Sequence, residues 1–113
     1  TNFSKAKILA TQLPSSYLLE TDIIGTYIDL SESIWQIAEI LATNNLETKN
    51  DQKEIVKWIE KLRLNGENNI EAIRIWRTSL GPEPWHTRVY DALTATKTTV
   101  DKISTFIEDR YVF

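Results

Sequence analysis

Cysteine is absent from this chain of 113 residues, and histidine occurs once. The lack of cysteine excludes a disulfide framework, thiolate zinc sites and a cysteine nucleophile. Without cysteine and with one histidine, a metal site would depend on carboxylates, and the sequence contains no Glu-x-x-His motif or calcium loop. The three glycines lie far apart, which excludes a glycine-rich phosphate loop. We therefore expect no metal ion and no cofactor.

Long apolar runs are missing as well. No run approaches the roughly 20 residues that span a bilayer, and the segment after Lys5 and Lys7 turns polar too soon for a signal peptide. These features predict a cytoplasmic protein without a membrane segment. The net charge of -3 has the wrong sign for binding nucleic acid through overall charge, so we expect no nucleic-acid partner.

Positive charge is unevenly distributed along the chain. Residues 8–48 contain no Lys or Arg but six acidic residues, whereas Lys49, Lys53, Lys57 and Lys61 then follow at intervals of four. One interpretation is that an acidic and a basic surface lie side by side within one molecule. Another is that the acidic segment faces a basic partner. A third hypothesis, a nucleic-acid-binding module, requires the lysines and Arg63 to be exposed and unpaired.

Apolar residues recur at intervals of three and four almost throughout, which predicts helices. We expect helices over residues 4–13, 15–43, 51–64, 68–80 and from 84 to at least 107, with Pro14, Asn65-Gly66 and Gly81 as interruptions. The predicted fold is all-α: a single domain over residues 1–113, formed by an antiparallel up-and-down helical bundle. It would contain two long helices, two short tandem helices and a short N-terminal accessory helix.

The second predicted helix is apolar over more than half of its circumference. One seam contains Ile23, Tyr27, Leu30, Ile34, Ile37 and Leu41, and a second line contains Ile24, Ile28, Trp35 and Ala38. Polar residues are confined to a narrow strip, which we expect to face water: Thr26, Asp29, Ser33, Gln36 and Glu39. This pattern predicts a central helix that contacts several neighbours or a second subunit.

The last predicted helix has the clearest pattern in the chain, and its middle section is rich in threonine. Beside its seam, which begins at His86, a stripe at intervals of seven contains Trp85, Ala92, Thr99 and Phe106. Our leading hypothesis is a non-enzymatic protein–protein interaction module, either an adaptor subunit or a small inhibitor or immunity-type protein. Its partner would be another protein or a second copy of itself, in a homo-oligomer. The candidate interface residues are Ile24, Ile28, Trp35, Trp85 and Thr99.

The segment from Arg74 to Arg88 concentrates groups that bind and react. Arg74, Arg77 and Arg88 could hold an anion near the start of the last helix, where free backbone N–H groups favour negative charge. His86 is the natural acid or base there. The alternative is structural: the arginines pair with Glu71, Glu83 and Asp91, and His86 packs at the end of a core seam.

The pair of Arg77 and His86 resembles a feature of the HEPN ribonucleases. These small all-helical enzymes place an Arg and a His near the start of a late helix, separated by fewer residues than the eight between Arg77 and His86, and a polar residue follows the Arg, as Thr78 does here. The resemblance implies a metal-independent ribonuclease, or an anion- or nucleotide-binding enzyme, that uses His86 with Arg77 and Arg88. Because the spacing departs from the family pattern, we transfer no catalytic role.

Overall fold

The computed structural model describes residues 1–43, 49–80 and 84–111, and within the last range it leaves out the side chains of 84–87, 89, 90, 92–94, 96 and 111. The described residues form helices and no strand. The helices are α1 (Asn2–Thr11), a short 3-10 turn η1 (Ser15–Tyr17), α2 (Leu18–Thr43), α3 (Lys49–Leu80) and α4 (Pro84–Tyr111). The all-α prediction is confirmed for these residues, as are the expected start of the last helix at Pro84 and the end of the second near Thr43.

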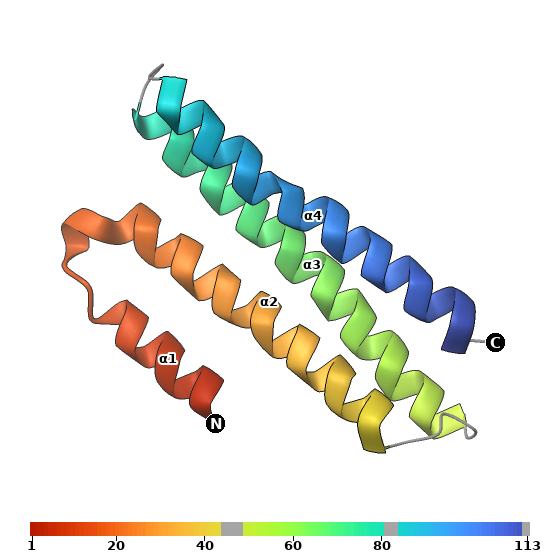
Figure 1. Cartoon of the computed structure of the whole chain (residues 1–113). Helices are drawn as coiled ribbons and strands as arrows, with labels where there is room; N and C mark the ends of the chain where they lie inside the picture. Colours follow the sequence, from red (N-terminus) through yellow and green to blue (C-terminus); the bar gives the residue numbers. More distant parts are fainter. Residues whose placement is uncertain (44–48, 81–83, 112–113) are drawn as a thin grey trace.

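The four helices lie side by side in chain order (Figure 1). α1 contacts α2, α2 contacts α3 and α3 contacts α4, whereas in the described part of the chain no Cα atoms of α2 and α4 approach within 8 Å. The molecule is consequently elongated and flattened, with extents of 50, 29 and 16 Å. Its radius of gyration is 16.2 Å, compared with about 13 Å for a compact domain of this length.

The hydrophobic core is centred on α3. Ile55, Ile59 and Leu62 of α3 are almost completely buried, and residues of both neighbouring helices pack with them: Leu30 and Ile37 from α2, Val100 and Ile107 from α4. The second helix contacts several neighbours, as expected, namely α1, η1 and α3, but the core is centred on α3 rather than on α2. α3 takes that position because it lies between the other two long helices.

The predicted tandem helices 51–64 and 68–80 are also wrong, because α3 continues through Asn65 and Gly66. A Cβ atom built on Gly66 would lie 3.4 Å from Cγ1 of Val100, an ordinary packing distance, so α4 packs closely on α3 at this position. The Asn65 side chain donates hydrogen bonds to α2. A glycine inside a helix lowers helix stability by about 1 kcal/mol relative to alanine. The packing against Val100 and the hydrogen bonds of Asn65 offset this loss.

α1 covers one flank of α2. It begins at Thr1, whose side-chain oxygen accepts a hydrogen bond from the backbone N–H of Ser4. Nζ of Lys7 lies 2.9 Å from the nearer carboxylate oxygen of Asp29 on α2. Ala10 is the one buried residue of α1, whereas Ile8 and Leu9 are exposed. None of the helices in the described ranges has the length and hydrophobicity needed to cross a membrane.

Candidate interaction surface

Two residues of the polar strip of α2, Thr26 and Ser33, face α3 rather than water. Ser33 is completely buried; its hydroxyl donates to the backbone oxygen of Asp29 (3.1 Å) and accepts from Nδ2 of Asn65 (2.9 Å). Nδ2 of Asn65 also donates to that same backbone oxygen at 3.2 Å. The expectation that the strip faces water is therefore wrong for its central residues, since these hydrogen bonds give the buried polar groups partners.

A second asparagine repeats this arrangement one turn further along α3. Asn69 is 3% exposed, and its Nδ2 donates to the backbone oxygen of Ile23 (3.2 Å) and to Oγ1 of Thr26 (3.0 Å). Residues four apart on a helix share a face, so Asn65 and Asn69 form a polar ladder along the α2–α3 contact. The hydrogen bonds of each asparagine fix the rotation of α2 about its own axis. If α2 were rotated, the buried amide groups of Asn65 and Asn69 would lose their hydrogen-bond partners.

This rotation leaves an apolar side of α2 uncovered. Ile24 is 41% exposed, Tyr27 58%, Ile34 44% and Trp35 59%. We define the outer strip of α2 as the residues in steps of four and three that lie away from α3: Ile24, Ile28, Ser31, Trp35, Ala38 and Ala42. All six are exposed or half-exposed, and none is charged. The strip extends over 18 residue steps, roughly 27 Å of helix.

Four of the five predicted interface residues can be placed. Ile24, Trp35 and Thr99 are exposed and Ile28 is half-exposed, whereas the side chain of Trp85 lies outside the described residues. The structure brings Ile24, Ile28 and Trp35 together in the outer strip. Thr99 lies on α4, on the far side of α3 from that strip (Figure 1). Nearby on α4, the exposed Phe106 ring has the guanidinium of Arg110 over it, 5.7 Å from the ring centre.

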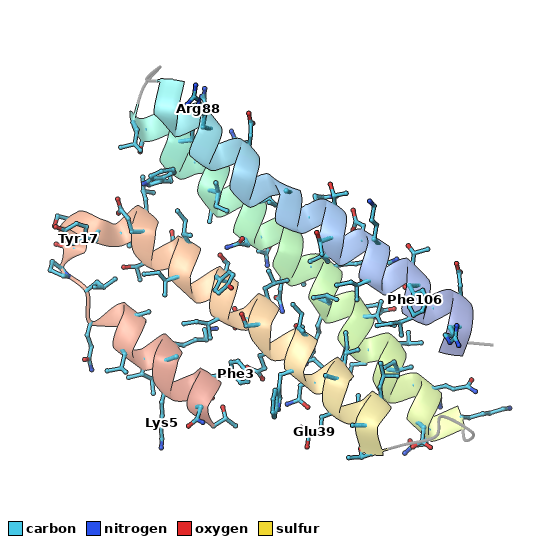
Figure 2. All side chains as sticks on the ribbon, in the orientation of Figure 1. Phe3, Lys5, Tyr17, Glu39, Arg88 and Phe106 are labelled. Atoms are coloured by element: carbon cyan, nitrogen blue, oxygen red, sulfur yellow. The ribbon has the colours of Figure 1, made fainter. Side chains whose placement is uncertain are left out.

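The candidate anion site is only partly described. Arg74 donates to both carboxylate oxygens of Glu71, with 2.8 Å between Nε and Oε2. This hydrogen bond from Arg74 lowers the pKa of the exposed Glu71 carboxyl. Arg77 is half-buried and is not free of partners, and Arg88 is exposed near the start of α4 (Figure 2). The side chain of His86 and residues 81–83 lie outside the described part of the structure.

The basic stripe of α3 is exposed, but not all of its charges are unpaired. Nζ of Lys61 lies 4.3 Å from the centre of the Trp58 ring, and Nζ of Lys57 lies 5.7 Å from it. Arg63 forms an ion pair with Glu108 of α4. The nucleic-acid hypothesis requires Arg63 to be unpaired, so this contact counts against it. Within the described ranges, no three His, Cys, Asp or Glu side chains gather to hold a metal ion.

The accessible surface of the whole chain is large for its mass. It measures 7,568 Å² at 13.1 kDa, about 1,200 Å² above the roughly 6,400 Å² expected for a monomeric globular protein of this mass. The excess follows from the flat arrangement, in which α2 and α4 each pack on α3 but not on each other.

No family model, curated protein or solved structure matches this chain.

Proposed function

We propose that this chain is a non-enzymatic protein–protein interaction module that self-associates through the outer strip of α2. Adaptor subunits and small inhibitor or immunity-type proteins belong to this class. The observation that carries the proposal is the orientation of α2: its Thr26 and Ser33 side chains are hydrogen-bonded inside the fold, while Ile24 and Trp35 are exposed. A continuous exposed apolar surface is typical of a surface that another molecule covers.

The free energy available at the strip supports this function. Complete burial of a large apolar side chain contributes about 1.5–3 kcal/mol. Within the strip, Trp35 is more than half exposed and Ile24 nearly so, so covering both would contribute roughly 1.5–3 kcal/mol in total. Tyr27 and Ile34, which lie outside the strip, are exposed to similar extents. The aromatic side chains are also of the type that concentrates binding energy at the centre of interfaces.

The flat arrangement leaves surface available for a partner. The whole chain exposes about 1,200 Å² more than expected for its mass, and a typical stable interface buries about 800 Å² on each partner. α1 and α3 contact α2 mainly through other positions, among them Asp29 with Lys7 and Ser33 with Asn65. Trp35 lines a hollow that Phe3 at the start of α1 also lines, so a second molecule on the strip meets the start of α1 there.

A charge placed in the strip tests the proposal. We expect Trp35→Glu to convert the self-associated protein into a monomer, because burying an unpaired carboxylate in an apolar interface is strongly unfavourable. Trp35 is 59% exposed, so the helical circular-dichroism signal should remain. Molar mass is measured by light scattering coupled to size-exclusion chromatography.

Ile75→Glu is the matched control. Ile75 is 43% exposed on α3, so this variant introduces the same charge at an exposed apolar position outside the strip and should retain the parent mass. A monomeric parent protein that also binds no other protein would contradict the proposal. A Trp35→Glu variant that associates as strongly as Ile75→Glu would contradict the assignment of the strip.

A further inference from the structure

The charges around the outer strip indicate the chemistry of a partner. We infer that the strip also binds a basic amphipathic helix of another protein, whose apolar side covers Ile28 and Trp35 and whose lysine or arginine side chains reach Glu32 and Glu39. This inference rests on the proposed interaction function and adds a partner of stated chemistry. The basic helix and a second copy of this chain compete for the same strip.

α2 carries negative charge along most of its length and contains no Lys or Arg. Its acidic residues are Glu20, Asp22, Asp29, Glu32 and Glu39. Among the described residues, Asp29 is the one member of this group that forms an ion pair, with Lys7 of α1. The last turn of α2 has no basic residue, although the carbonyl end of a helix favours positive charge. A cationic partner would supply the charge that α2 itself lacks.

The chain already holds one basic helix against α2. α1 contains Lys5 and Lys7 and no acidic residue, and Nζ of Lys7 lies 2.9 and 3.1 Å from the two carboxylate oxygens of Asp29. α1 lies along one flank of α2 and leaves Ile24 and Trp35 exposed. A second basic helix on the outer strip would repeat this mode of binding beside the first.

The cations of the partner would bind in a hollow of about 400 Å³ at the border of the strip. Phe3 at the start of α1 and Glu39 on α2 line it (Figure 2), together with Glu32 and Trp35. The side chains that line this hollow include two carboxylates and an exposed indole, and none of them is Lys or Arg. A guanidinium or ammonium group forms charge-assisted hydrogen bonds with carboxylates and is attracted to an aromatic face. The hollow therefore suits a cationic side chain.

The spacing of the two carboxylates suits a helix as the partner. Glu32 and Glu39 are seven residues apart, which places them on one side of α2 and about 10 Å apart along its axis. Basic residues seven apart on a helix packed beside α2 would have the same spacing, while its apolar residues face Ile28 and Trp35. A second α2 would instead bring further carboxylates to the strip. The basic helix should therefore bind more tightly than a second copy and displace it.

Fluorescence anisotropy of a labelled synthetic peptide tests the inference with the full chain. The peptide is an amphipathic helix with leucine on one side and arginine on the other, and its counterpart has glutamate in place of each arginine. The arginine peptide should bind the protein, and the glutamate peptide should not. Glu32→Gln combined with Glu39→Gln should weaken binding of the arginine peptide roughly three- to tenfold, because two ion pairs at the surface are lost. Light scattering should show that the arginine peptide converts the self-associated protein into a complex with one chain.

Glu54→Gln combined with Glu60→Gln is the matched control, because it removes the same charge from exposed positions on α3 and should leave binding unchanged. Equal weakening by the two double variants would overturn the inference, since binding would then follow overall charge alone. An arginine peptide that leaves the self-associated protein intact would also overturn it, while the proposed self-association would stand. A monomeric protein that binds the arginine peptide would support the inference and contradict self-association. A protein that binds neither itself nor the peptide would overturn both.

Discussion

At the scale of single residues, two buried serines differ in whether their hydroxyl groups have hydrogen-bond partners. Ser33 and Ser104 are both completely buried. The hydroxyl of Ser33 both donates and accepts a hydrogen bond at the α2–α3 contact. Oγ of Ser104, on α4, has no hydrogen-bond partner among the described residues. A buried polar atom without a partner costs about 1–3 kcal/mol.

The two serines should therefore respond oppositely to the same substitution. Ser104→Ala should raise the free energy of unfolding by about 1 kcal/mol, because it removes an unpaired hydroxyl and introduces a better helix former. Ser33→Ala should lower it by about 1 kcal/mol or more, because the amide of Asn65 loses a partner. Urea denaturation at a single protein concentration measures both changes. Equal destabilisation by the two variants would show that Ser104 has a partner after all.

At the scale of the helices, the continuity of α3 depends on what Gly66 does. A glycine that ends a helix occupies a left-handed conformation, in which alanine is strained. Gly66 instead lies inside α3, and a Cβ atom there would meet Val100 at 3.4–3.8 Å, an ordinary packing distance. The short distance leaves room for one methyl group but not for a larger side chain.

We therefore expect Gly66→Ala to stabilise the protein by up to about 1 kcal/mol, the helix-propensity difference between the two residues. Gly66→Leu should destabilise it, because the side chain would separate α4 from α3. Thermal unfolding followed by circular dichroism compares the variants. Gly25→Ala is the control, because Gly25 lies inside α2 and a Cβ built on it meets no neighbouring atom within 4 Å. This variant should gain a similar amount of stability. A strong loss of stability in Gly66→Ala but not in Gly25→Ala would contradict a continuous α3.

The helices could be predicted from the sequence only where the signals are local. Pro84 and the periodicity after it predict α4, because a proline acts on its own backbone. Asn65-Gly66 is a local signal for a helix end, but here its residues serve contacts with α2 and α4 that lie far away in sequence. The exposed Ile24 and Trp35 follow from the excess of apolar positions on α2. The rotation of α2 could not be predicted, because it depends on Asn69 bonding to Thr26, 43 residues away.

At the scale of the whole molecule, the flat arrangement links the fold to the proposed function. The core lies along α3, and some apolar residues that border the core on α2 remain partly exposed. Ile34, which is in line with the buried Leu30 and Ile37, is 44% exposed. A second copy on the outer strip would cover further apolar side chains of α2, among them Ile24 and Trp35. Self-association would then contribute to the stability of each copy, and the stability would increase with protein concentration.

The central claim is that another chain covers the exposed side of α2. Sedimentation equilibrium of the unmodified protein tests this claim most directly. Each chain has a mass of 13.1 kDa. A concentration series should fit a monomer–dimer equilibrium, with the average mass rising on concentration toward twice that of one chain. A mass that stays at 13.1 kDa at every concentration would contradict self-association through the outer strip.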